Sequence, residues 1–158
     1  MARVNKDIWI EASPERIFDY ISFPSNLPEI WPSLVEIYDI KPLPNGNYSL
    51  RWTYEMLCMR FEGKAEYTEI VPNEYYVCQT RGGIKSTIIW TVRPWEDKTR
   101  VTFTVDYKVP IPLLGKLAEA IIVKATDHEG DLVLVNLKNR MEANKKVAAA
   151  GITLATSY

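Results

Sequence analysis

The chain has 158 residues, 47% of them hydrophobic and 25% charged, a composition typical of one compact globular domain. Lys and Arg number 19 against 20 Asp and Glu, so the net charge of -1 gives no reason to expect a nucleic-acid partner. The opening residues MARVNKDIWIEA alternate in polarity and do not resemble a secretory signal, and no segment approaches the ~20 apolar residues of a membrane span. We therefore expect a cytoplasmic protein without a transmembrane segment.

The first elements are predicted to be a strand and two short helical segments. Residues 3–11 alternate in polarity, which indicates a strand. Ser13 is a suitable N-cap, and Pro14 fits the first helical position because its missing N–H needs no partner there. The three prolines of FPSNLPEIWPSL limit the next segment to one or two helical turns. The apolar stripe of the first helix is Ile17, Phe18 and Ile21.

The region from Val35 to Val109 has a period of two, which predicts consecutive antiparallel strands with one apolar and one charged face. Further strands are expected at 75–81 and 84–93, where both faces are mixed and the inward face stays open. The apolar faces comprise Leu50, Trp52, Tyr54 and Met56, then Phe61, Gly63, Ala65 and Tyr67, then Val101, Phe103, Val105 and Tyr107.

Residues 113–145 are predicted to form one long helix that covers the apolar face of the sheet. His128, the only histidine, falls within the expected apolar stripe, and Gly130 indicates a bend or a close approach. The acidic side chains Asp127, Glu129 and Asp131 are interpreted as a solvated flank. The expected stripe is Leu114, Leu117, Ala118, Ile121, Ala125, Leu132 and Val135.

These elements predict an α+β domain in which a curved antiparallel sheet of six to seven strands grips a long C-terminal helix, with two short helices after the first strand. The domain is expected to span 1–146, with 147–158 as a tail that packs or frays. A straight helix can contact only part of a curved sheet, so we expect a cavity between the two.

Two segments resemble a known family. ASPERIFDYISFPSNLPEIWPSL is similar to the opening of the START-like superfamily, also called SRPBCC, helix-grip or birch-pollen-allergen-like. LVNLKNRME, at 134–142, resembles the ending of its polyketide cyclase/dehydrase-like branch. The resemblance spans nearly the whole chain and implies the helix-grip fold. Members of the superfamily transfer lipids, bind plant hormones or quinones, cyclise polyketides or assist other proteins, so the resemblance does not select one function.

His128 has three interpretations: a packing residue, a group of the cavity lining that hydrogen-bonds a ligand, or a general acid/base. We expect it to face the space between helix and sheet. Phosphate-binding and nucleophile motifs are missing from the sequence, and one His with two separate Cys does not suggest a zinc site. A Rieske centre would need a second histidine. No cofactor or metal is indicated.

The leading hypothesis is therefore binding or carriage of a hydrophobic small molecule that is lipid-, polyketide- or quinone-like. The alternatives are a cyclase or dehydratase that uses His128 as acid/base, with Tyr107 or Tyr67 as a hydrogen-bond donor, and a protein-interaction module. The missing motifs favour binding over catalysis. The expected cavity residues are Trp52, Tyr54, Phe61, Tyr67, Trp90, Phe103, Tyr107, Leu117, Ile121, His128 and Leu132.

Overall fold

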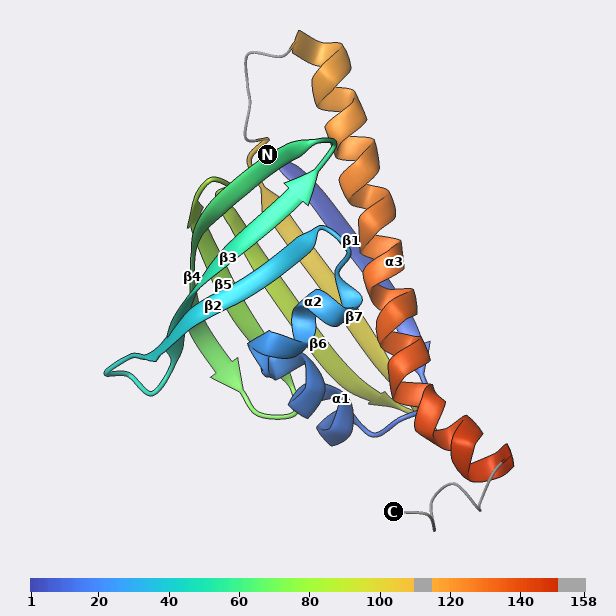
Figure 1. Cartoon of the computed structure of the whole chain (residues 1–158). Helices are drawn as coiled ribbons and strands as arrows, with labels where there is room; N and C mark the ends of the chain where they lie inside the picture. Colours follow the sequence, from blue (N-terminus) through green and yellow to red (C-terminus); the bar gives the residue numbers. More distant parts are fainter. Residues whose placement is uncertain (110–114, 151–158) are drawn as a thin grey trace.

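The computed structural model contains a seven-stranded antiparallel sheet and a long helix laid across it (Figure 1). It describes the backbone of residues 1–109 and 115–150, and the side chains of 1–109 and 115–143. The predicted helix-grip architecture is confirmed. In chain order the elements are β1 (Ala2–Ile10), α1 (Pro14–Ser22), the 3-10 turn η1 (Pro24–Asn26), α2 (Leu27–Ile30), β2 (Leu34–Pro42), β3 (Tyr48–Met56), β4 (Met59–Val71), β5 (Tyr75–Gly82), β6 (Ser86–Trp95), β7 (Lys98–Tyr107) and α3 (Gly115–Ala150).

The strand order is β1-β7-β6-β5-β4-β3-β2, so β2 to β7 form a meander and β1 pairs with the last strand. The register of this pair runs from Ala2 opposite Tyr107 to Ile10 opposite Thr99. Register shifts interrupt β2 and also β4, between Tyr67 and Glu69. Such bulges bend a strand and increase its twist, which contributes to the curvature of the sheet.

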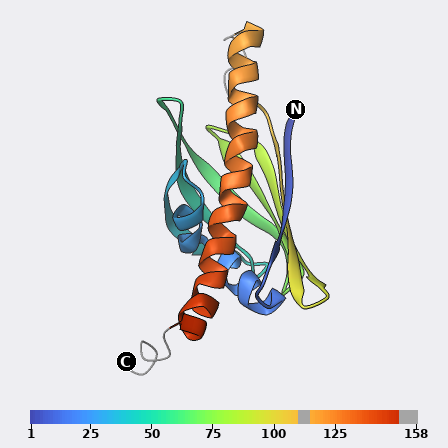
Figure 2. The ribbon, with the colours of Figure 1, turned by 90° about the vertical axis from the view of Figure 1, so that its right-hand side faces the viewer.

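Helix α3 lies along the open side of the curved sheet, with β1 on one flank and the α2–β2–β3 region on the other (Figure 2). Lys6 of β1 forms ion pairs with Asp127 at 2.9 Å and with Asp131 at 3.4 Å. These ion pairs link the solvent-exposed side of α3 to the edge strand β1.

The short helices fill one end of the concave face. The side chain of Ser13 accepts a hydrogen bond from the Arg16 N–H at 3.2 Å, which confirms the predicted N-cap. Ile17, Phe18 and Ile21 are buried as predicted. The Tyr76 hydroxyl donates to the Ile21 carbonyl at 2.9 Å, which ties α1 to the sheet. Neither α1 nor α2 covers the other end of the concave face (Figure 1).

Two predictions about boundaries cannot be compared with the described residues. The predicted helix start at 113, together with Leu114 of the expected stripe, lies outside the described residues, as does segment 151–158 of the expected tail. The division into a domain of 1–146 and a tail of 147–158 therefore stays a prediction, although α3 continues to Ala150.

Gly130 marks a close approach of α3 to β1. A Cβ atom at this position would lie 2.5 Å from Val4 Cγ1 and 3.3 Å from Lys6 Cγ, both on β1. Val4 is buried, so its side chain has little freedom to move away. The close approach that the sequence suggested is confirmed.

We expect Gly130→Ala to destabilise the fold by about 1–3 kcal/mol, because the overlap with Val4 outweighs the gain of about 1 kcal/mol in helix propensity. Urea denaturation measures the change. Val4→Ala makes room for the added methyl, so in a double-mutant cycle G130A should cost less in the V4A background. A G130A protein more stable than the parent would contradict the packing argument.

Candidate functional site

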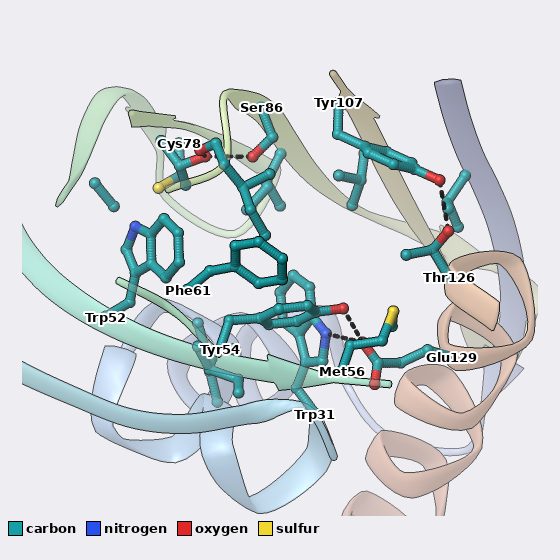
Figure 3. Close-up of a pocket in the computed structure, with 18 of the residues that line it drawn as sticks. Trp31, Trp52, Tyr54, Met56, Phe61, Cys78, Ser86, Tyr107, Thr126 and Glu129 are labelled. Atoms are coloured by element: carbon teal, nitrogen blue, oxygen red, sulfur yellow. Dashed lines mark hydrogen bonds between the residues drawn. The ribbon is translucent and has the colours of Figure 1, made fainter. Parts of the chain in front are cut away.

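A cavity of about 130 Å³ lies between the concave face of the sheet and α3 (Figure 3). Its wall combines inward side chains of strands β1 to β7 with Leu27 of α2, Trp31 and one face of α3. Most of the lining residues are aliphatic or aromatic. An apolar cavity of about 150 Å³ in another protein binds benzene, so this space is large enough for a small organic molecule.

The strand residues predicted for the cavity lie where the alternation placed them. Trp52, Tyr54, Phe61, Tyr67, Phe103 and Tyr107 all line it. Trp90 points the same way but lies deeper: it is fully buried and packs against Phe103 with ring centroids 4.4 Å apart. The two strands whose orientation was open contribute Cys78, Thr80, Ser86 and Ile88 to the lining.

The predicted cavity residues on α3 are wrong, because the helix turns a different face to the cavity. Leu117 is 80% exposed, Ile121 is 52% exposed, and Leu132 is also on the outside. His128 is exposed and is not among the cavity residues, so the expectation that it faces the cavity is wrong. The helix instead presents Ile122, Thr126, Glu129 and Gly130 to the cavity.

Glu129 is the polar centre of the site, although the sequence suggested a solvated residue. Its side chain is only 7% exposed and its two oxygens accept hydrogen bonds from three residues. Oε1 accepts from Trp31 Nε1 at 2.8 Å and from the Tyr54 hydroxyl at 2.6 Å. Oε2 accepts from the Ser33 backbone N–H at 3.1 Å and from the Ser33 hydroxyl. A carboxylate can accept about four hydrogen bonds, so these four donors use its acceptor capacity.

Aromatic rings surround this carboxylate and form one wall of the cavity (Figure 3). Trp31 contacts Tyr54 and Phe103 edge to face, with centroids 6.5 Å and 5.2 Å apart. Burial raises the pKa of Tyr54, and the neighbouring Glu129 carboxylate raises it further. The phenol therefore remains a hydrogen-bond donor to Glu129 across the physiological pH range.

Two pairs of hydroxyl groups provide further polar contacts of the lining. The Tyr107 and Thr126 oxygens lie 2.5 Å apart and join β7 to α3. The Thr80 and Ser86 oxygens, also 2.5 Å apart, join β5 to β6. In the part of the chain that the structure describes, no group of three or more His, Cys, Asp or Glu side chains is placed to hold a metal ion.

Several cavity residues were not predicted, each for a physical reason. Glu129 counts as polar in any hydropathy pattern, and its donors lie nearly a hundred residues away in sequence, in Trp31 and Ser33. Met56 and Met59 line the cavity, but methionine fills gaps in many environments and so carries little positional signal. Trp31 lines the cavity, but a tryptophan in a short turn fits a packing role equally well, so the sequence does not single it out.

We expect Glu129→Gln to destabilise the protein by about 1–3 kcal/mol. Each carboxylate oxygen accepts from a fixed N–H, one from Trp31 and one from Ser33. An amide has only one oxygen, so one of these donors must lose its acceptor. Urea denaturation measures the loss.

Glu119→Gln is the matched control, because Glu119 is an exposed carboxylate on the same helix, and it should change stability by less than about 0.5 kcal/mol. Equal effects of E129Q and E119Q would contradict the role given to the buried carboxylate.

The two cysteines should differ strongly in reactivity. Cys58 is exposed, whereas Cys78 lines the cavity, and burial raises the pKa of its thiol to about 12. At pH 8 only about one Cys78 in ten thousand is then a thiolate, the reactive form. We expect a charged thiol reagent to modify one cysteine rapidly, and Cys58→Ala to abolish this fast phase. Two fast phases in the parent protein would show that Cys78 is accessible.

Comparison with solved structures places this architecture among known proteins. A protein from Thermus thermophilus, TTHA0849, superimposes with a TM-score of 0.78 at 19% sequence identity, covering 90% of this chain and 98% of that one. A START superfamily protein from Mycobacterium smegmatis gives a TM-score of 0.75 at 17% identity, covering 90% and 99%. The Zhui aromatase/cyclase from Streptomyces sp. R1128 gives 0.72 at 13% identity, covering 94% and 97%. At these identities the similarity shows the fold alone.

No curated protein matches the sequence. None of the helices that the structure describes is long and apolar enough to cross a membrane. The sequence profile described as "Polyketide cyclase / dehydrase and lipid transport" matches residues 1–142. The match covers most of the chain and both segments on which the resemblance to the START-like superfamily was based. The chain therefore belongs to the polyketide cyclase/dehydrase and lipid transport family.

Proposed function

We propose that the chain binds a hydrophobic small molecule in the cavity between the sheet and α3. The observation that carries the proposal is the lining itself: aromatic and aliphatic side chains enclose a space that the side chains of the protein do not fill. A close-packed domain leaves few voids larger than a water molecule, so a cavity of about 130 Å³ is unusual for a purely structural core.

The polar groups of the cavity support binding of a specific molecule. They are few and lie on different walls, and Glu129, Tyr107 and Thr80 are each held by a partner within the protein. Ligand sites of this kind combine an apolar lining with a small number of fixed polar groups that orient the ligand. The family description, which includes lipid transport, is compatible with this function.

The geometry favours binding over the acid/base chemistry considered for His128. A general acid or base must reach the reacting atom directly or through one water. His128 is exposed on the outer side of α3, away from the cavity lining. The alternative of a cyclase or dehydratase based on this histidine therefore loses the residue on which it depended. The interaction-module hypothesis stays a prediction.

A bulky substitution inside the cavity should abolish binding. Val105 lines the cavity from β7 and is only half-buried, so a tryptophan at this position has space to extend into the opening. We expect Val105→Trp to weaken binding of the neutral probe N-phenyl-1-naphthylamine at least about tenfold, because the indole occupies the ligand volume. Probe fluorescence measures the affinity, and circular dichroism checks the fold.

Thr102→Trp is the matched control, because Thr102 lies on the same strand and is not part of the cavity lining. This variant should bind the probe like the parent. Equal binding by parent, V105W and T102W would locate the probe elsewhere and contradict the proposal. Native mass spectrometry of gently purified protein, before and after organic extraction, tests whether a natural ligand is carried.

A further inference from the structure

The hydrogen-bonding state of the cavity lining restricts the chemistry of the ligand. A hydroxyl has one proton to donate and two lone pairs that accept. If the proton is already used inside the protein, the group can offer a ligand only its lone pairs. The hydroxyls of the described lining belong to Tyr54, Tyr67, Thr80, Ser86, Tyr107 and Thr126.

A third contact shows which hydroxyl is the donor in the Tyr107–Thr126 pair. Thr126 Oγ1 lies 2.7 Å from the Ile122 carbonyl oxygen, which can only accept, so the Thr126 proton is used there. The contact of 2.5 Å between the two hydroxyls then requires Tyr107 to be the donor. The Tyr107 oxygen retains only acceptor capacity.

The same reasoning applies to the pair on β5 and β6. Thr80 Oγ1 donates to the Ile84 carbonyl at 2.9 Å. Ser86 must therefore donate the proton in its contact of 2.5 Å with Thr80. The Ser86 oxygen, like that of Tyr107, is left as an acceptor.

The two remaining tyrosines of the lining are Tyr54 and Tyr67. Tyr54 donates to Glu129 Oε1 at 2.6 Å. Tyr67 is only 2% exposed and packs against Tyr76 with ring centroids 5.0 Å apart. The Tyr76 hydroxyl donates to the Ile21 carbonyl at 2.9 Å. Trp31 Nε1 donates to Glu129. The Trp52 Nε1 group is without a partner among the described residues, but its nitrogen has less than 1 Å² of accessible surface and does not reach the open space.

The charge of the lining also restricts the ligand, because it disfavours anionic groups. Glu129 is the only Asp, Glu, Lys, Arg or His in the cavity wall formed by residues 1–109 and 115–143. An anionic ligand group would lose its hydration, find no cation and lie in the same cavity as a buried carboxylate. An unpaired buried charge is strongly unfavourable.

We propose that the ligand of this cavity is an apolar molecule carrying hydrogen-bond donors, such as an alcohol, phenol or amine, and that carboxylates and other anions are excluded. The inference rests on the proposed function, because it assigns the ligand class of the same cavity. The lone pairs of Tyr54, Ser86 and Tyr107 receive the ligand's donors, and the surrounding rings cover its apolar body.

Four probes of one skeleton test the inference on the full chain: naphthalene, 2-naphthol, 2-methoxynaphthalene and 2-naphthoate, by calorimetry at pH 7. We expect 2-naphthol to bind about 2- to 10-fold more tightly than its methyl ether, the range of one net hydrogen bond. The ionised 2-naphthoate should bind at least about tenfold more weakly than naphthalene.

The outcomes separate this inference from the proposed function. If naphthalene and 2-naphthol both fail to bind, the proposed function fails. If naphthalene binds and 2-naphthoate binds equally well, or the methyl ether binds as tightly as 2-naphthol, the cavity binds apolar molecules but the ligand class assigned here is wrong.

A charge variant provides a second test. Glu129→Gln should raise the affinity for 2-naphthoate relative to naphthalene at least about threefold, because it removes the like charge. Asp131→Asn removes an exposed carboxylate on the same helix outside the cavity and should leave that ratio unchanged. A folded E129Q protein that excludes 2-naphthoate as strongly as the parent would overturn the electrostatic part of the inference. If E129Q does not fold, the comparison of the four probes in the parent protein tests whether the cavity excludes anions.

Discussion

The buried carboxylate of Glu129 is the interaction on which the arrangement of the site depends. It is held entirely by neutral donors from two other parts of the fold: the segment after α2, with Trp31 and Ser33, and β3, with Tyr54. Buried charges are usually paired with a cation or neutralised. Here four neutral N–H and O–H donors stabilise the carboxylate, and their contacts tie α3 to the segment after α2 and to β3.

This constraint explains how one curved sheet provides both a packed core and an open cavity. The short helices fill one end of the concave face with Ile17, Phe18 and Ile21. Glu129 and the close approach at Gly130 hold α3 near β1 and the Trp31 region. The helix therefore lies against the edge strand and the segment after α2, and the central strands beneath it face open space.

The sequence was sufficient to predict the fold class and the inward faces of most strands. Strand faces follow from a period of two, and Trp52, Phe61 and Phe103 obeyed it because one side of the sheet is covered and the other is solvated. The rotation of α3 could not be obtained in this way. The helix has apolar residues on two sides, and the side that faces the sheet includes Thr126, Glu129 and Gly130. A hydropathy pattern ranks that side below the one with Leu117, Ile121 and Leu132, because the pattern does not register partners that come from distant segments.

The pairing of β1 with β7 has a consequence for how the protein forms. Arg100 and Asp7 are linked across 93 positions of sequence, and Lys6 and Asp127 across 121. Closing such long loops precedes any gain from the contacts, which slows folding. A chain emerging from the ribosome can build the meander of β2 to β7 early, but β1 must wait for its partner strand and for α3. The cavity wall runs from Val4 on β1 to Gly130 on α3, so the cavity is complete only after the elements at both ends of the domain have come together.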